Sequence, residues 1–176
     1  MQTAKSTSLT DAFIGYVKKA ENPDRVGFDR AKGRWFPHKD PAGGHAIGYG
    51  HRLTPQETSQ FARGGATERQ VEDMLVGDLM LARQNVHRYI RQKYGAQIQL
   101  HPRQEQMLMD YAFNLGSLAD FPKMVRAVLD WDVKTMWREY PRYAKIGGRT
   151  TQLTGRNKLF ADTFLPPQKN SKIPNS

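Results

Sequence analysis

Two carboxylates near the N-terminus, Glu21 and Asp40, stand in a setting that suits the hydrolysis of a sugar–sugar bond. Glu21 ends a segment with helical periodicity, and Asp40 opens the turn of a predicted hairpin. Such hydrolysis requires one acid that protonates the leaving oxygen and a second group that activates water or stabilises the developing positive charge. Glu21 is the candidate acid, and its surroundings must keep it protonated. Asp40 is the candidate second carboxylate.

The elements that position these carboxylates are a helix and a hairpin. The helix is predicted over residues 9–20, where apolar side chains recur at helical spacing. Pro23 ends it, because the residue before a proline avoids the helical region. Residues 34–38 and 45–49 are predicted as two strands. The intervening sequence, DPAGG, is rich in residues that favour tight turns.

The remainder of the chain is predicted to be helical. Thr54-Pro55-Gln56-Glu57 and Thr67-Glu68-Arg69-Gln70 have the form of capping boxes. The first opens a short helix that stops at Gly64-Gly65, and the second opens a long helix that continues to about Tyr94. After Pro102, helices are predicted at 103–115, 123–129, 133–140 and 154–164. A helix as long as the second one often joins two lobes with a cleft between them.

The composition is typical of one globular domain. With 176 residues, 38% of them hydrophobic and 10% aromatic, the chain can form a single domain, which we expect over residues 1–165. Within it we expect a hairpin lobe at about 22–66 and a helical lobe at about 67–165 that also includes the N-terminal helix. The polar residues 166–176 contain proline and are expected to form a flexible tail.

The charge and the missing residue types narrow the function classes. The chain contains no cysteine, which excludes disulfides, thiolate metal sites and a cysteine nucleophile. We expect no transmembrane segment and no signal peptide, because the sequence lacks the apolar runs that these require. The net charge of +10 favours polyanions: nucleic acid, an anionic membrane or a cell-wall polymer. Because no nucleic-acid-binding motif is found, we expect no specific nucleic acid partner.

Three sequence blocks occur in an order that one family shows. They are DPAGGHAIGYGH at 40–51, AFNLG at 112–116, and GGR at 147–149 followed by LTGRNKLF at 153–160. In these blocks the chain resembles the phage-type lysozymes. The resemblance implies a lysozyme-like α+β fold, mainly α with a small β-hairpin lobe. It also implies cleavage of the β-1,4 bond between N-acetylmuramic acid and N-acetylglucosamine in peptidoglycan, with no cofactor and no metal.

The resemblance suggests catalytic roles residue by residue. Glu21 matches the catalytic glutamate that ends the first helix, and Asp40 matches the aspartate that opens the hairpin. Asp29 is the alternative second carboxylate, because it follows Glu21 at a spacing closer to that of the family. Ala46 stands where the family has a threonine that helps to hold water. The adjacent His45 could replace that threonine as a base or as the group that holds water.

Four further residues are expected at substrate-binding positions. Tyr49 is expected either in the core or stacked on a sugar ring. His51 is expected to make a structural hydrogen bond near the acid. Asn114 and Arg156 match family positions that line or brace the cleft, and Arg156 could pair with Glu21 or contact sugar.

The expected function is a peptidoglycan-degrading muramidase, an endolysin that lyses the bacterial host. The alternatives on the same fold are a lytic transglycosylase, with His45 in a central role, and a catalytically inactive cell-wall-binding module. A basic protein acting on nucleic acid or membranes ranks last. We expect a monomer, attracted to anionic envelope polymers by its charge. It would remain in the host cytoplasm until the membrane is permeabilised and then reach the periplasm or cell wall, unless it is carried in the virion.

Overall fold

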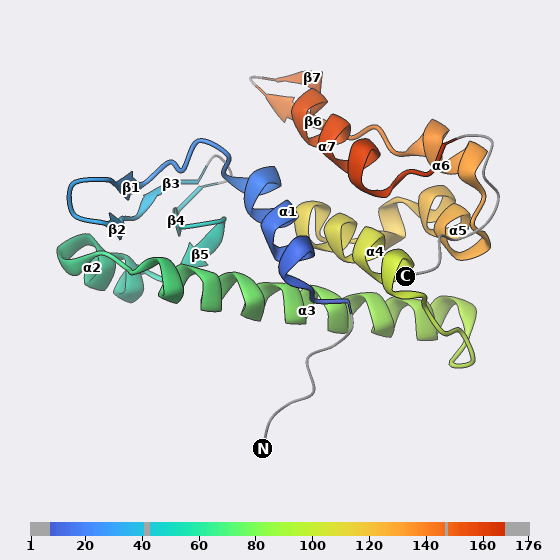
Figure 1. Ribbon diagram of the computed structural model, residues 1–176, viewed down its shortest axis with the longest axis horizontal. Helices are drawn as coiled ribbons and strands as arrows, with labels where there is room; N and C mark the ends of the chain where they lie inside the picture. The colour runs from blue at the N-terminus through green and yellow to red at the C-terminus, as the bar shows by residue number, and fades with distance from the viewer. Residues whose placement is uncertain (1–7, 41–42, 147, 168–176) are drawn as a thin grey trace. The chain divides into compact units, whose positions relative to one another are not determined.

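Helices dominate the structure, a computed structural model that describes residues 8–40, 43–146 and 148–167 (Figure 1). The helices are α1 (Asp11–Glu21), α2 (Pro55–Gly64), α3 (Glu68–Tyr94), α4 (Pro102–Leu115), α5 (Pro122–Asp130), α6 (Val133–Glu139) and α7 (Thr154–Phe164), with a 3-10 turn η1 (Leu118–Asp120). The strands are β1 (Phe28–Asp29), β2 (Arg34–Trp35), β3 (His38–Lys39), β4 (His45–Ile47), β5 (His51–Leu53), β6 (Tyr143–Ile146) and β7 (Arg149–Gln152). The predicted fold class, mainly α with small antiparallel hairpins, is confirmed.

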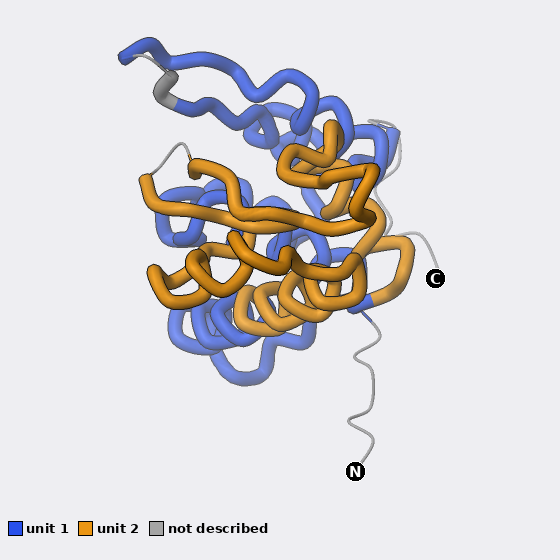
Figure 2. Tube along the Cα trace, turned by 90° about the vertical axis from the view of Figure 1, so that its left-hand side faces the viewer, with its two compact units in different colours: residues 1–9, 83–176 blue, residues 10–82 orange. Residues whose placement is uncertain are grey.

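The chain divides into two compact units (Figure 2). The strand unit is Thr10–Ala82, and the helical unit is Met1–Leu9 with Arg83–Ser176. The division therefore falls within α3. Helix α1 belongs to the strand unit, whereas the sequence analysis had grouped it with the helical lobe.

The strand unit contains two small antiparallel sheets. One pairs β1 with β2, and the other has the order β3-β4-β5. The sequence analysis predicted one strand over residues 34–38, but the segment divides between the two sheets after Trp35. Pro37 lacks the N–H that a continuous ladder requires. The N–H of Phe36 donates instead to the carbonyl oxygen of Gly27 at 2.7 Å.

The strand β4 is shorter than predicted, because it ends at Ile47. Gly48 has a φ of +63°, outside the extended region. A Cβ at this position would lie 2.6 Å from the Cβ of Val71 in α3, so a larger residue would clash. The glycine therefore lets the turn approach α3 closely before β5 returns as the third strand.

Both predicted capping boxes are present. The Oγ1 atom of Thr54 accepts a hydrogen bond from the N–H of Glu57, whose carboxylate accepts one from the N–H of Thr54. Thr67 and Gln70 make the same reciprocal pair at the start of α3. These bonds satisfy N–H groups that would otherwise lack partners. Helix α3 ends at Tyr94, as predicted.

The helical unit is organised around α4, which packs against α5 and η1. Its side chains Met107, Leu108 and Met109 are at most 1% exposed. The ring of Tyr111 meets that of Phe160 edge to face at 5.5 Å. This helix therefore supplies much of the apolar core of the unit.

Two expectations for the C-terminal part need correction. Helices alone were predicted after Pro102, but β6 and β7 form a hairpin over residues 143–152. Gly148 has a φ of +79° beside the turn, and Gly147 lies outside the described residues. Pro166 was assigned to the flexible tail, yet it is buried and its carbonyl oxygen accepts a 2.8 Å hydrogen bond from Trp137 Nε1. Residues 168–176 of the expected tail are not described.

Candidate active site

The candidate acid lies where α1 meets the three-stranded sheet. Glu21 is the last residue of α1 and is half-buried. A Cβ built on Gly50 would lie 3.8 Å from Glu21 Oε2, so the carboxylate lies beside the turn between β4 and β5. The next residue, Asn22, is buried, and its Nδ2 donates to the carbonyl oxygens of Gly48 at 2.8 Å and Val26 at 3.0 Å. Asn22 thereby fixes the end of α1 to the same turn.

The second candidate carboxylate is bound by a residue of the same sheet. Asp40 follows β3, and its side chain is 17% exposed. The Nε atom of Arg52, in β5, donates to Asp40 Oδ2 at 3.1 Å. Because Arg52 comes only two residues after Gly50, the segment 50–52 links the surroundings of Glu21 and Asp40. The sheet therefore brings the two predicted carboxylates to one short piece of structure.

His45 lies on the opposite face of the sheet from the Asp40–Arg52 pair. Its Cα partner in β5 is Leu53, whereas the partner of Ala46 is Arg52. Since successive residues of a strand project to opposite faces, His45 points away from the face that carries Arg52. His45 is also exposed. The geometry does not favour the catalytic role suggested for it.

Tyr49 is a core residue in this structure, with 4% of its surface exposed. Its hydroxyl donates to Glu68 Oε1 at 2.6 Å, and its ring meets Trp35 edge to face at 5.2 Å. Burial, together with the hydrogen bond to Glu68, raises the pKa of the phenol. Stacking on a sugar would require this ring to leave the core.

Glu68 accepts hydrogen bonds from Tyr49 and from two side chains near it. Its Oε2 atom accepts hydrogen bonds from Arg25 at 2.8 Å and from Trp35 Nε1 at 2.9 Å. Burial would raise the pKa of this carboxyl. The hydrogen bonds from Tyr49, Trp35 and Arg25, with the charge of Arg25, outweigh burial and hold the pKa below its usual value. Glu68 therefore joins the first turn of α3 to the strands.

His51 makes a hydrogen bond to the long helix, whereas the expectation was a structural hydrogen bond near the acid. Its Nδ1 atom lies 2.8 Å from Asp78 Oδ2, on α3. Both side chains are partly exposed, at 25% and 32%. This pair anchors the first residue of β5 to the long helix.

Asp29, the alternative second carboxylate, shapes the turn between β1 and β2. Its Oδ1 atom accepts from the N–H groups of Ala31 at 3.0 Å and Lys32 at 3.1 Å. The backbone hydrogen bond from Lys32 is the main cause that lowers the pKa of Asp29. These contacts show that Asp29 stabilises the turn. Asp40 therefore remains the better candidate for the second catalytic carboxylate.

The two remaining predicted residues belong to the helical unit. Arg156 is 8% exposed at its side chain, and its guanidinium donates to Asp110 Oδ1 at 2.8 Å. Arg142 donates to Asp110 Oδ2 at 2.6 Å, so one buried carboxylate braces two arginines. Asn114 lies near the end of α4, and its Oδ1 atom is buried with no hydrogen-bond partner among the described residues. A pair between Arg156 and Glu21 would join the two units and stays a prediction.

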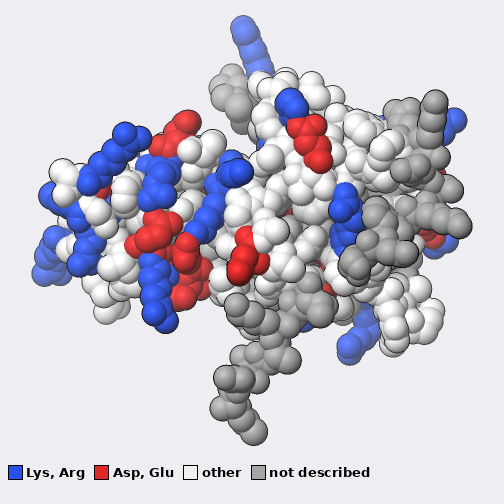
Figure 3. Space-filling model, in the orientation of Figure 1, with Lys and Arg blue, Asp and Glu red and all other residues white. Residues whose placement is uncertain are grey.

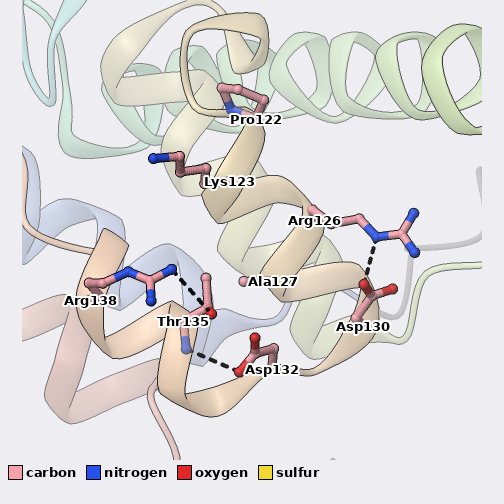
Figure 4. A pocket seen from close by; sticks show the side chains of 8 residues that line it. All are labelled: Pro122, Lys123, Arg126, Ala127, Asp130, Asp132, Thr135 and Arg138. Carbon is pink, nitrogen blue, oxygen red and sulfur yellow. Dashed lines mark hydrogen bonds and ion pairs between the residues drawn. The ribbon is translucent and has the colours of Figure 1, made fainter.

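Among the described residues of the helical unit, surface pockets lie apart from Asn114 and Arg156. One of about 400 Å³ lies between α5 and α6 (Figure 4), where Arg126 pairs with Asp130 at 2.6 Å. Another, of about 500 Å³, lies along α3. Its lining, which we call the basic face, consists of Arg83, Gln84, His87, Arg88, Arg91 and Gln92. None of these six residues is acidic, although Arg83, at 2.8 Å, and His87 both pair with the carboxylate of the buried Glu105. On the face of the strand unit in Figure 3, acidic and basic side chains lie interspersed.

The sequence model of the phage lysozyme family matches residues 32–158, which is more than half of the chain. This chain belongs to the phage lysozyme family. The matched region of the chain includes Asp40, His45, His51, Asn114 and Arg156, whereas Glu21 precedes it. The assignment of Glu21 therefore depends on its place at the end of α1.

A curated relative of this chain is the peptidoglycan hydrolase gp36 of Enterobacteria phage SP6. The two are 34% identical over 117 residues, which is 59% of this chain and 12% of the relative. The chain thus matches only a small part of the relative's length. Among the residues described, no group of three or more histidine or acidic side chains could hold a metal ion, and no helix could span a membrane.

Sequence reasoning missed the residues that position the candidate acid and base. Asn22 was read only as the end of a helix, and Arg52 was not singled out. Glu68 was read only as part of a capping box. A signal for Arg52 was available in the sequence. Arg52 lies six residues after Ala46, so a third strand returning from the hairpin would place it opposite Ala46.

Proposed function

We propose that this phage lysozyme is a muramidase that hydrolyses the β-1,4 bond between N-acetylmuramic acid and N-acetylglucosamine in peptidoglycan. Family membership and the relative named as a peptidoglycan hydrolase support this proposal. The observation that carries it is the short segment 50–52, which adjoins both carboxylates: Glu21 lies beside Gly50, and Arg52 holds Asp40.

In this proposal Glu21 is the general acid. It protonates the glycosidic oxygen as the bond to the anomeric carbon breaks. It is the last residue of α1, where the helix dipole presents its negative end. Asn22 keeps the carboxyl group at the turn through its bonds to Gly48 and Val26.

Asp40 is the second carboxylate. The contact with Arg52 orients its carboxylate, so it can accept a proton from water or stabilise the oxocarbenium-like transition state. Neither step requires a cofactor or a metal ion. The stereochemical outcome follows from which of these two roles Asp40 takes.

The experiment that tests this proposal is clearance of purified peptidoglycan by the Glu21→Gln variant. We expect a loss of at least about 10²-fold in rate, because a general acid contributes about that much or more. Glu57→Gln is the matched control, since glutamine preserves the capping box of α2. Equal clearance by wild type and Glu21→Gln would overturn the role of Glu21.

The proposed biological role is that of an endolysin. We infer a route from host cytoplasm to periplasm or cell wall after a separate protein has permeabilised the membrane, with carriage in the virion as the other route. The basic face is suited to anionic envelope polymers, because Arg88 and Arg91 are exposed there. Binding of peptidoglycan without bond cleavage would instead favour an inactive binding module.

A further inference from the structure

One histidine lies on the same sheet face as the second carboxylate. His38, Ala46 and Arg52 are directly opposed across β3, β4 and β5. Directly opposed residues in antiparallel strands project to the same face, with Cβ atoms about 4.5–5.5 Å apart. Since Arg52 binds Asp40 with its Nε atom, the imidazole of His38 belongs to the face that this pair occupies.

Asp40 extends the same row of residues along the chain. It lies two positions after His38, and its N–H donates to the carbonyl oxygen of Gly44 at 3.2 Å, which continues the ladder between β3 and β4. Residues two apart in a strand share a face. Both the register and the strand period therefore place His38 and Asp40 together.

The packing of His38 determines which of its ring nitrogens can act. Its Nδ1 atom is buried, with no hydrogen-bond partner among the described residues. A Cβ built on Gly27 would lie 2.9 Å from this nitrogen, so it packs against the glycine backbone. The side chain as a whole is only half-buried. Nε2 is therefore the atom that can contact a water or a ligand.

The side chains of Ala46 and Arg52, on the same face, are poorly suited to hold the reacting water. Ala46 offers only a methyl group, and it lies between His38 and Arg52. Arg52 is engaged with Asp40. His45 projects from the other face. This leaves His38 as the polar group next to Asp40 that has no protein partner at its outer nitrogen among the described residues.

We propose that His38 holds, through Nε2, the water that reacts with the sugar, an inference that rests on the proposed muramidase function. In the reaction the bond between the anomeric carbon and the glycosidic oxygen breaks, and Glu21 transfers its proton to that oxygen. The water oxygen bonds to the anomeric carbon, and Asp40 takes the proton that the water loses. His38 makes a hydrogen bond to this water throughout and carries no proton away.

Three variants test this inference by measuring kcat and KM on purified peptidoglycan fragments. His38→Ala should lower kcat about 10²-fold with little change in KM, because a misplaced reactant costs about that much. His38→Gln should retain more activity than His38→Asn, since the glutamine amide reaches the position of Nε2 and the asparagine amide that of Nδ1. Equal losses in the glutamine and asparagine variants would contradict a role for Nε2.

A rescue experiment separates this role from a structural one. The double variant His38→Ala/Ala46→Ser places a hydroxyl at the opposed position, where it can hold the same water. Its kcat should be at least about tenfold higher than that of His38→Ala. A purely structural role for His38 predicts no such rescue. His45→Gln is the competing arm: a greater loss there than in His38→Ala would overturn the proposal in favour of His45.

The failure of this inference can be distinguished from failure of the proposed function. If wild type releases no sugar fragments, the muramidase proposal itself fails. If wild type is active and Glu21→Gln is not, yet folded His38→Ala and His38→Gln retain full kcat, only the role of His38 is wrong. Circular dichroism and thermal unfolding establish that each variant is folded.

Discussion

The side-chain amide of Asn22 donates a 2.8 Å hydrogen bond to the backbone carbonyl of Gly48. This bond ties the residue that follows Glu21 to the turn beside which the Glu21 carboxylate lies. The Oδ1 atom of Asn22 also accepts from the N–H of Val26 at 2.8 Å, so all functions of the amide group are used. A residue that sequence reasoning treated as a helix end thus positions the candidate acid.

Replacing Asn22 by alanine should lower activity and stability together. Three hydrogen bonds are lost and the carbonyl oxygen of Gly48 loses a partner, which costs about 1–3 kcal/mol in the free energy of unfolding. Urea unfolding measures this cost. Since the Glu21 carboxylate would no longer be fixed, kcat should fall more than KM rises. Unchanged kcat in a destabilised variant would show that Asn22 has no part in positioning Glu21.

The Glu68 carboxylate should make the stability of the strand unit sensitive to acid. Its pKa in the folded state lies below the ordinary value of 4.5, despite the opposing effect of burial, because Tyr49, Trp35 and Arg25 donate to it. The stabilisation is therefore complete above about pH 4.5 and is lost as the pH falls through the folded-state pKa. Denaturant unfolding at several pH values measures this loss. Between about pH 5 and about pH 3, where glutamate carboxyls titrate, the free energy of unfolding should decline more steeply for wild type than for Glu68→Gln. Parallel curves would contradict this.

The buried Asp110 should be indispensable to the helical unit. It is fully buried and accepts from both Arg142 and Arg156. Asp110→Ala leaves two largely buried guanidinium groups without their shared carboxylate, which should cost about 3–5 kcal/mol. Thermal and denaturant unfolding measure the loss. The surface pair Arg126–Asp130 is the comparison, since Asp130→Ala should cost less than about 1 kcal/mol.

The basic face should contribute to binding of the cell wall. In the double variant Arg88→Gln/Arg91→Gln, wall binding should weaken several-fold at low salt, and the difference should shrink as ionic strength rises. The control is Arg63→Gln/Arg69→Gln, which removes the same charge from exposed positions of the strand unit. Equal weakening in both double variants would show that net charge, and not the basic face, governs binding.

Local patterns predicted much of the fold. The capping boxes at Thr54 and Thr67, and the apolar spacing along α3, depend only on residues close in sequence, and the corresponding helices form at the predicted positions. The hairpin over residues 143–152 was missed, because no strand was assigned between the helices predicted at 133–140 and 154–164. The division of residues 34–38 between two sheets depends on Gly27, a partner that periodicity cannot reveal.

The candidate site was only partly predictable for a related reason. Glu21 and Asp40 stand in recognisable motifs, but the contacts that place them come from Asn22 and Arg52 through folding of the chain. Register separates the two histidines, since His45 is adjacent to Ala46 in sequence whereas His38 is adjacent to it across the sheet. Such cross-strand neighbours are known only once the pairing is known.

The most direct test of the muramidase proposal is to digest purified peptidoglycan with wild type and with Glu21→Gln and to identify the released sugars by mass spectrometry. The proposal predicts muramic acid at new reducing ends with wild type and none with Glu21→Gln. Anhydro-muramic ends would contradict hydrolysis and indicate a lytic transglycosylase. Binding to the polymer without release of any sugar would contradict the enzymatic role altogether.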